Sequence, residues 1–236
     1  MPRPQAAPVA QSLDGIAIFK GLPPVALARL QSRCSWRRYE SGEPIVDYLD
    51  TSDDVFFMVV GEARASIYSL QGKVVTFCDL LPGDMFGEYA AVDGAPRSAS
   101  IEARTGCVVA IMSGATFREV SQTEPAVSQM LLRHFVAKIR TLTTRVYEFS
   151  ALAVSNRIHA EVLRLAKLGP LKGRTAHIAT APTHAEIASR ISTHREAVTR
   201  EFNYLSRLGI IERRGRALIV KDVDRLAAIV HEVTGE

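Results

Sequence analysis

The sequence predicts an α+β protein built from three successive parts: a β-roll or small barrel, one long helix, and a helix-turn-helix unit that ends in a β-hairpin. Between Trp36 and Phe117, short apolar runs are separated by Gly, Asp and Pro turns at a spacing of roughly ten residues, which is typical of short antiparallel strands. Apolar residues then recur at intervals of three and four, which favours an amphipathic helix. Near the C-terminus, two helix-start patterns precede two β-prone runs.

The composition indicates a folded chain with room for two domains. It has 236 residues, of which 47% are hydrophobic, and a net charge of +4 that neither demands nor excludes a nucleic-acid partner. Residues 1 to about 12 are rich in Pro, Ala and Gln and are expected to form a loose arm. Because no apolar run reaches the length of a signal peptide or a membrane span, we expect a cytoplasmic protein with no membrane partner.

The cysteines argue against a disulfide framework and against a metal site. Cys34, Cys78 and Cys107 are odd in number and far apart, and no close pair of Cys or His has the spacing of a zinc or iron-sulfur site. We therefore expect no metal, no iron-sulfur cluster and, since no axial ligand stands out, no haem.

In the β-rich half, apolar runs are separated by regularly spaced turn residues. Its apolar runs are VFFMVV, ASIYSL, VVTFCDLL and CVVAIM. Gly61, Gly72, Gly83 and Gly94 recur every eleven residues, as turn residues would. A short amphipathic helix is expected before this half, over residues 23 to 33.

One stretch in the β-rich half combines groups that bind phosphate and sugar. Residues 86 to 103 read FGEYAAVDGAPRSASIEA, with Arg97 nine residues after Glu88. A helical turn over residues 86 to 92 would expose N–H groups that attract phosphate, and Arg97 could clamp phosphate oxygens. Glu88 is an acceptor when ionised and suits a ribose hydroxyl. The alternative interpretation is an Arg97–Glu88 salt bridge at a corner of the sheet.

The long helix carries an apolar stripe that we call the seam. Its spacing of 3, 4, 3, 4 and 3 residues is that of an a/d repeat, and no Gly or Pro interrupts it. The stripe could pack on its own domain or form a symmetric two-helix dimer contact. The seam residues are Leu132, Phe135, Ile139, Leu142, Val146 and Phe149.

The region after the long helix predicts a second compact domain. Residues 154 to 167 suit an amphipathic helix, and residues 168 to 182 suit a loop with one short strand. The linker between the two halves, near residues 150 to 155, is expected to be helical. Two capping-box patterns follow, Thr183 with Glu186 and Thr193 with Glu196, and each predicts the start of a helix.

These two helices would meet at residues 192 and 193 as a helix-turn-helix, whose second helix lies in a DNA major groove. The second helix would begin near His194 and expose Arg195, Glu196, Thr199 and Arg200. Arginine can bond guanine, and glutamate can accept from cytosine. Alternatively, Glu196 is only a cap and the arginines are solvated surface. The run Arg213-Arg214-Gly215-Arg216 joins the two β-prone segments as a basic hairpin that suits phosphate contact.

This sequence resembles one family of bacterial transcription regulators, that of the cyclic-AMP receptor protein and the fumarate-nitrate reduction regulator. The resemblance rests on the motifs FGE and PRSA, which are followed by a long helix and then by HREAVTR. The resemblance covers roughly residues 15 to 230. It implies an N-terminal cyclic-nucleotide-binding β-roll of the jelly-roll type over 15–122, a long dimerisation helix over 123–152, and a C-terminal winged helix-turn-helix DNA-binding domain over 153–233.

The resemblance also implies a set of ligand contacts. Glu88 matches the ribose-binding acid, Arg97 the phosphate-binding arginine and Ser98 the hydroxyl residue beside it, while Cys78 would line the purine. The neighbour of Thr143 that carries a hydroxyl in the family is Leu142 here, so we expect cyclic GMP to bind as well as cyclic AMP. The ligand-binding candidates are Cys78, Phe86, Gly87, Glu88, Tyr89, Ala90, Arg97, Ser98, Ala99, Lys138 and Thr143.

The partners implied are a second copy of the chain, double-stranded DNA with an inverted-repeat operator and, as a further possibility, RNA polymerase. The DNA-binding candidates are Thr183, His194, Arg195, Glu196, Thr199, Arg200, Arg214 and Arg216.

Three other functions fit parts of the pattern. A redox or gas sensor of the same fold would need clustered cysteines or a haem ligand. In a DNA-binding protein without an effector, the stretch of residues 86 to 103, which we call the cassette, would be a vestige. An enzyme acting on nucleotides would need a nucleophile with a base or a metal cluster, and the sequence supports neither, so we expect no enzymatic activity.

Overall fold

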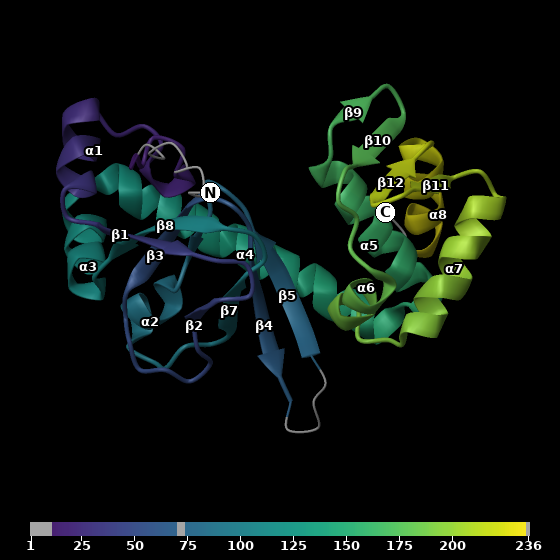
Figure 1. Ribbon diagram of the computed structural model, residues 1–236, viewed down its shortest axis with the longest axis horizontal. Coiled ribbons are helices and arrows are strands. Elements are labelled where there is room, and N and C mark those ends of the chain that lie inside the picture. Colours follow the sequence, from purple (N-terminus) through teal and green to yellow (C-terminus); the bar gives the residue numbers. More distant parts are fainter. Residues whose placement is uncertain (1–10, 70–73, 235–236) are drawn as a thin grey trace, which may run out of the picture. The chain divides into compact units, whose positions relative to one another are not determined.

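The computed structural model describes residues 11–69 and 74–234, and the chain divides into two compact units, residues 1–139 and 140–236 (Figure 1). The elements of the first unit up to the long helix are η1 (Ala17–Phe19), α1 (Pro24–Gln31), β1 (Ser35–Tyr39), β2 (Pro44–Val46), β3 (Val55–Val60), β4 (Ala63–Tyr68), β5 (Val74–Leu80), β6 (Met85–Phe86), α2 (Glu88–Asp93), β7 (Ser100–Ala103), β8 (Cys107–Met112) and α3 (Gly114–Thr123). The long helix α4 (Pro125–Ala151) follows.

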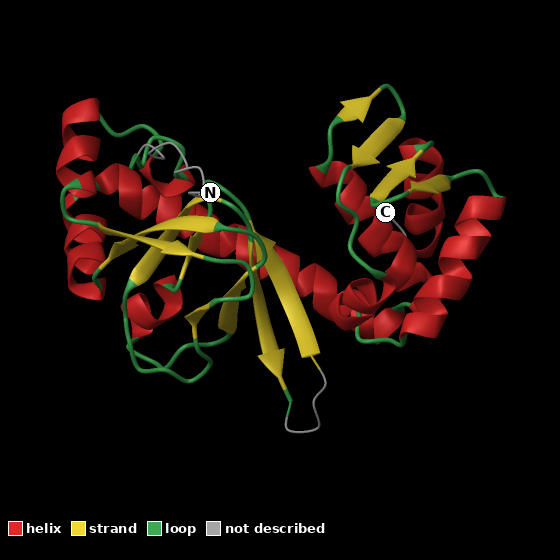
Figure 2. Cartoon of the chain, in the orientation of Figure 1, coloured by secondary structure: helices red, strands yellow, loops and turns green. Residues whose placement is uncertain are grey.

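The remaining elements belong to the second unit. They are α5 (Val154–Leu168), β9 (Leu171–Lys172), β10 (Thr175–Ile178), α6 (His184–Arg190), α7 (Arg195–Arg207), β11 (Ile211–Arg214), β12 (Ala217–Val220) and α8 (Val223–Thr234). The predicted order of β-roll, long helix and winged helix-turn-helix is confirmed, and Figure 2 shows most of the strands in the first unit and helices in both.

The first unit is a roll of two four-stranded antiparallel sheets, ordered β1-β8-β3-β6 and β2-β7-β4-β5. Strand β3 is buried on both faces. Successive side chains point to opposite sides of a strand, so alternate residues of β3 enter different cores. Val55 and Phe57 pack with Phe117 of α3, whereas Phe56 and Met58 pack into the core between the sheets. The apolar run VFFMVV is therefore the central wall of the roll, as its lack of alternation indicates.

Three of the four regularly spaced glycines are turn or cap residues. Gly61, Gly83 and Gly94 have φ angles of +88°, +99° and +71°, a region that side chains with a Cβ rarely adopt. Gly94 ends α2 rather than joining two strands. The fourth, Gly72, lies outside the described residues.

Helix α4 has 27 residues, so the predicted long helix is confirmed. Leu132, Ile139, Leu142 and Val146 are each more than half exposed, at 66%, 61%, 55% and 63%, and Phe149 is 40% exposed. Only Phe135 of the seam is partly buried. The interpretation that the stripe packs on its own domain is therefore wrong for five of its six residues.

The predicted helical linker is also wrong. Helix α4 ends at Ala151, and α5 begins at Val154 after Ala153, whose φ and ψ of −60° and 157° are extended. Leu152 is buried, and its N–H still bonds to the Glu148 carbonyl at 3.1 Å. The break therefore directs an apolar side chain into the structure, a requirement that helix periodicity alone does not reveal.

The second unit is a winged helix-turn-helix around one core. The sheet order is β11-β12-β10-β9, so the segment 168 to 182 contributes two short strands rather than one. Ile187 and Ile191 pack with Val198, Phe202 and Leu205, as the apolar spacing predicts. Helices α6 and α7 are thus held together by their buried faces.

Only the first of the two predicted capping boxes forms. Thr183 accepts a bond from the Glu186 N–H, and Glu186 accepts one from the Thr183 N–H. Helix α7 is instead capped by His194 without a side-chain bond. Ser192 has a φ of +53°, and after this tight turn the Thr193 N–H bonds to the Ala188 carbonyl at 3.0 Å. Thr193 thus belongs to the turn between the helices, and His194 takes the cap position.

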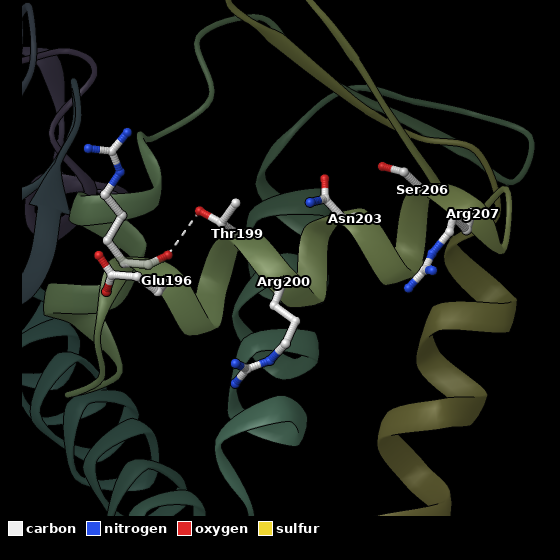
Figure 3. Close-up of a pocket in the computed structure, with 7 residues that line it drawn as sticks. Glu196, Thr199, Arg200, Asn203, Ser206 and Arg207 are labelled. Atoms are coloured by element: carbon white, nitrogen blue, oxygen red, sulfur yellow. Dashed lines mark hydrogen bonds between the residues drawn. The ribbon is translucent and has the colours of Figure 1, made fainter.

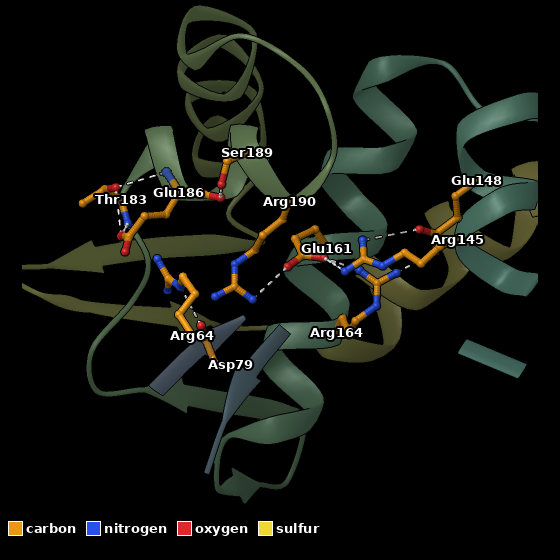
Figure 4. A network of polar contacts seen from close by, with 10 residues as sticks. All are labelled: Arg64, Asp79, Arg145, Glu148, Glu161, Arg164, Thr183, Glu186, Ser189 and Arg190. Carbon is orange, nitrogen blue, oxygen red and sulfur yellow. Dashed lines mark hydrogen bonds and ion pairs between the residues drawn. The ribbon is translucent and has the colours of Figure 1, made fainter. Parts of the chain in front are cut away.

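A buried ionic network joins α4, α5 and α6 within the second unit (Figure 4). Glu161 of α5 has a side chain only 1% exposed and lies 3.1 Å from Arg145 of α4 and 3.7 Å from Arg190 of α6. Arg164 pairs with Glu161 and, at 2.6 Å, with Glu148. Since a buried cation is costly without its partner, Glu161 keeps three arginines compatible with burial.

In the described parts of the chain, no helix combines the length and apolar character that crossing a membrane would take. Within the same residues, no three His, Cys, Asp or Glu side chains gather closely enough to hold a metal ion.

We expect Glu161→Gln to lower the free energy of unfolding of the second unit by about 3–5 kcal/mol, because it leaves buried guanidinium groups without their carboxylate. Urea denaturation followed by circular dichroism measures the loss. The matched control is Asp224→Asn, which removes an exposed pair with Arg174 at 3.1 Å and should cost less than about 1 kcal/mol. Equal losses in the two variants would show that burial of the network contributes nothing.

Candidate functional site

The backbone of the cassette stretch requires glycine at position 87. Gly87 has a φ of +81° and precedes α2, which begins at Glu88 rather than at Phe86. A Cβ at this position would lie 2.7 Å from Arg97 Nη1 and 2.8 Å from the Asp54 carbonyl oxygen. Gly87 therefore lets the chain turn tightly against the arginine.

Phe86 belongs to the core of the roll rather than to an open site. Its side chain is 3% exposed and stacks on Phe56 with ring centroids 5.1 Å apart. Ala90 is likewise buried, so both residues offer a ligand only backbone groups.

Arg97 is buried and held by acceptors on three sides. It is 2% exposed, and its Nη1 and Nη2 donate to the carbonyl oxygens of Gly87 at 2.8 Å and Asp54 at 2.9 Å. Nε and Nη2 both donate to Ser52 Oγ, at 3.2 and 3.0 Å. Burial lowers the pKa of Arg97, while nearby acids, Asp50 first, oppose that shift. The site thus contains a fixed guanidinium group at the turn.

Ser52 is a residue that sequence reasoning missed. Asp50 binds its N–H at 3.1 Å and its hydroxyl at 3.0 Å, and the Asp50 carbonyl accepts from the Arg97 N–H at 2.8 Å. The spacing Asp-x-Ser is the pattern of a local Asx turn and is the signal that could have found it. The loop that carries Ser52 therefore lies along Arg97.

Glu88 does not pair with Arg97, so the salt-bridge alternative is wrong. Glu88 is 2% exposed, and its Oε1 lies 3.0 Å from His134 Nε2 and 3.3 Å from Lys138 Nζ, both on α4. Burial would raise the pKa of Glu88, but the His134 hydrogen bond and the Lys138 charge outweigh it and lower that pKa. The cassette acid is thereby kept ionised.

Lys138, a sequence candidate, therefore lies at the cassette, whereas His134 was missed. The two are four residues apart on α4 and so share one face of the helix, which is the signal that could have identified His134. The ring of Tyr89 lies under Lys138 Nζ at 5.2 Å and 6.0 Å from the ring of Phe135. Tyr89 thus contributes its side chain to the contact of α2 with α4, not only backbone groups.

The other ligand candidates differ in exposure. Cys78 on β5 is partly buried, and burial raises the pKa of its thiol, which keeps it neutral and suited to line an apolar ring. Ser98 is exposed and Ala99 is partly buried. Thr143 lies on an exposed part of α4 within the second unit.

In the second unit, side chains along one side of α7 line an open depression (Figure 3). The sequence predicted four of them, and Asn203, Ser206 and Arg207 were missed. Asn203 lies four residues after Thr199 and Ser206 three residues after Asn203, a spacing that continues the same face. The lining residues are Arg195, Glu196, Thr199, Arg200, Asn203, Ser206 and Arg207.

The Thr199 hydroxyl is already engaged within the protein. It donates to the Arg195 carbonyl at 3.0 Å and lies 2.8 Å from His184 Nδ1. Burial lowers the pKa of His184, and the charges of Arg213 and Arg195 lower it further, which favours the neutral ring. Because the Thr199 hydroxyl proton is directed to the Arg195 carbonyl, the tautomer with a proton on Nδ1 suits this contact. Thr183 is similarly engaged in its capping box, and His194 is exposed as the cap of α7.

The basic hairpin forms as predicted, with β11 and β12 paired from Ile211–Val220 to Arg214–Ala217. Arg214 Nε bonds to Glu212 Oε1 at 2.5 Å, and Lys221 lies 2.6 Å from the same carboxylate. Hydrogen bonds from Arg214 and Lys221 lower the pKa of Glu212 to about 2. Arg213, Arg214 and Arg216 are all exposed, and Arg214 is in addition part of an ion pair.

Two family models match the two units. Residues 36–124 match the cyclic nucleotide-binding domain, and residues 156–229 match the Crp-like helix-turn-helix domain. The chain belongs to the family of the cyclic-AMP receptor protein and the fumarate-nitrate reduction regulator. This family consists of DNA-binding transcription regulators and not of enzymes.

Named relatives agree with this assignment along most of the chain. A CRP-like cAMP-activated global transcriptional regulator of Mycobacterium tuberculosis is 24% identical and covers 89% of this chain and 94% of its own length. The cAMP-activated global transcriptional regulator Vfr of Pseudomonas aeruginosa is 27% identical over 82% of this chain and 92% of its own length.

The fold agrees as well. The structure of FixK2 from Bradyrhizobium japonicum superposes with a TM-score of 0.73 at 18% identity, covering 83% of this chain and 96% of that protein. The likeness shows a shared fold of β-roll, long helix and winged helix-turn-helix.

Proposed function

We propose that this chain is a homodimeric transcription regulator whose binding to an inverted-repeat operator is controlled by cyclic AMP and cyclic GMP. The observation that carries the proposal is the pair of buried, oppositely charged groups in the cassette, Arg97 and an ionised Glu88, held apart by different partners. A cyclic nucleotide has an anion and a hydroxyl to match them. The names of the two relatives as cAMP-activated regulators support the same ligand class.

The phosphate would bind on the edge of Arg97 that faces Ser52. On this edge, Nε and Nη2 both donate to the Ser52 hydroxyl. A phosphate oxygen is a stronger acceptor because the hydrogen bond is then charge-assisted on both sides. The two carbonyl bonds of Arg97 to Gly87 and Asp54 would keep the guanidinium in place during that exchange.

The purine contacts explain why we include cyclic GMP. Ser98 is exposed next to Arg97 and could accept from the 2-amino group of a guanine. Thr143 can both donate and accept, so it does not distinguish a 6-amino from a 6-oxo purine. Leu142 removes the second hydroxyl that the family resemblance leads one to expect around adenine. Cys78 would form a neutral wall of the pocket.

The exposed seam of α4 is the proposed dimer contact. Its a/d spacing matches that of helices that pair in a coiled coil, and its large apolar side chains are exposed along the helix. A symmetric pair would bury the same stripe of both copies. Thr143, next to seam residue Leu142, would then lie beside the contact, where it could reach the ligand of the other subunit.

The exposed face of α7 is the proposed reading surface for DNA. In a dimer, two such helices enter successive major grooves, so the operator is expected to be an inverted repeat with half-site centres about 34 Å apart. Arg195, Glu196 and Arg200 would contact base edges, and the family resemblance implies a GTG-like core in each half-site. Arg213 and Arg216 of the hairpin would contact phosphates. A contact with RNA polymerase stays an expectation of the resemblance.

Control by the ligand requires that it bind the DNA-competent state more tightly than the idle state. Moving the population from 1:99 to 99:1 takes about 5.5 kcal/mol of such preference. A buried phosphate clamp and a contact from the second subunit can together supply that amount. Cyclic GMP could therefore occupy the pocket and still drive DNA binding less strongly than cyclic AMP.

We expect Arg97→Leu to weaken binding of both nucleotides at least a hundredfold, because the variant leaves a buried phosphate without its cation. Isothermal titration of the full-length protein with cyclic AMP and cyclic GMP measures the effect. The matched control is Arg38→Leu, which removes an exposed arginine of β1 and should leave both affinities unchanged. Circular dichroism verifies that each variant folds.

Unchanged affinity in folded Arg97→Leu would assign the phosphate to another residue. Absence of cyclic GMP binding to the wild type at millimolar concentration would limit the ligand to cyclic AMP. Equal cyclic GMP affinity in Ser98→Ala and wild type would mean that Ser98 does not contact the guanine.

Ile139→Asp is expected to convert the dimer to monomers, because it brings two carboxylates together at the symmetric contact. Sedimentation velocity measures the result. Thr144→Asp places the same charge on α4 on the side of the helix away from the seam and should leave the dimer intact. A dimer of unaltered stability in Ile139→Asp would place the contact elsewhere.

Arg200→Ala should lose about 1–3 kcal/mol at its cognate base pair and relax specificity there. The contrast is Arg216→Ala, which should weaken binding by a similar factor on all sequences and reduce the salt dependence. Fluorescence anisotropy with operators mutated one base pair at a time separates the two behaviours. A uniform loss for Arg200→Ala would make it a phosphate contact instead.

A further inference from the structure

The junction of α2 and α4 contains one polar residue that the proposed ligand contacts leave without a role. His134 contacts Glu88 of the cassette and, with its ring, Phe135 of the seam, with centroids 5.8 Å apart. We propose that His134 is a positioning residue that holds the Glu88 carboxylate in place for the 2′-hydroxyl of the cyclic nucleotide. This inference rests on the proposed function and deepens it.

The geometry leaves part of the carboxylate available to a ligand. His134 Nε2 and Lys138 Nζ both meet Oε1, at 3.0 and 3.3 Å. A carboxylate has two oxygens and about four acceptor sites, so these donors do not use all of its capacity. The side chain of Glu88 is only 3% exposed, and its orientation is therefore set by these protein contacts rather than by water.

His134 makes the shorter and more directional of the two contacts. Lys138 is a point charge on a flexible stem, and its ammonium group also lies over the ring of Tyr89 at 5.2 Å. The ring of His134 also lies edge-on to that of Phe135, a contact that favours the orientation in which Nε2 meets Glu88. Removing His134 would leave the buried carboxylate with its charge partly balanced by Lys138 but without its shortest side-chain contact.

The chemistry of a cyclic nucleotide indicates which of its groups would bind the Glu88 carboxylate. In a 3′,5′-cyclic nucleotide the 3′ and 5′ oxygens are esterified, so the 2′-hydroxyl is the only free hydroxyl of the ribose. A hydroxyl that donates to an ionised carboxylate forms a charge-assisted bond. A Glu88 that is misaligned or protonated would lose that bond, while the phosphate contact at Arg97 would persist.

The same contact reaches the proposed dimer seam. Phe135 is the one seam residue that is partly buried, and its ring lies 6.0 Å from that of Tyr89, the residue after Glu88. The contacts of His134 with Glu88 and with Phe135 would thus connect a ribose bound at Glu88 to the seam, within the first unit. Ligands that lack the 2′-hydroxyl would bind without contacting Glu88 and therefore without this connection to the seam.

The test compares cyclic AMP with 2′-deoxy cyclic AMP on full-length wild type, His134→Leu and His134→Gln by isothermal titration. Wild type is expected to prefer cyclic AMP by about ten- to hundredfold, the value of a hydrogen bond to a charged group. His134→Leu should reduce that preference to a few-fold by weakening only cyclic AMP binding. His134→Gln keeps an N–H donor and should restore most of the preference. Arg133→Leu, an exposed neighbour on α4, should behave as wild type.

Retention of the full preference in His134→Leu would overturn the inference while leaving the proposed function intact. Tighter cyclic AMP binding in that variant would also overturn it, because His134 would then compete with the ribose. A parallel loss for both nucleotides would mean a general structural effect and reject the specific role. If wild type binds neither nucleotide, the proposed function itself fails.

Discussion

The buried guanidinium of Arg97 is the constraint around which the first unit is organised. A cation that is 2% exposed needs acceptors, and the structure provides them from Gly87, Asp54 and Ser52. Meeting that need fixes the left-handed turn at Gly87, the course of the loop through Ser52 and the start of β7. The cassette is therefore a consequence of satisfying one buried charge, and a ligand phosphate would take over part of that task.

A second theme is that α4 makes the same kind of polar contact in both units. In the first unit, its His134 and Lys138 are the polar partners of a buried acid, Glu88. In the second unit, its Arg145 meets the buried acid Glu161 of α5, which also contacts Arg190 of α6. In each unit a buried carboxylate, rather than apolar packing alone, fixes the position of the long helix. Val127, Met130 and Leu131 pack on the core of the first unit, and the exposed apolar side chains farther along the helix form the seam.

Residue patterns predicted the motifs well but predicted the partners of the motif residues poorly. The glycine, acid and arginine of the cassette lie together as expected, yet Arg97 and Glu88 do not pair with each other. Their partners, Ser52 and His134, come from a loop and a helix that are more than 30 residues away in the chain. Local spacing carries no information on such contacts, because they depend on how the strands and helices fold back.

By itself, the sequence determined the order and type of the elements, since hydrophobic periodicity, turn glycines and the Thr183 capping box act over a few residues. It also determined the two functional stretches, because each is contiguous. Only the tertiary structure decided that the seam is exposed, that the chain breaks at Leu152 and Ala153, and that Thr199 and Arg214 are engaged within the protein. Burial and ion pairing are properties of three-dimensional neighbours, and a charged side chain takes the nearest partner that the completed fold brings to it.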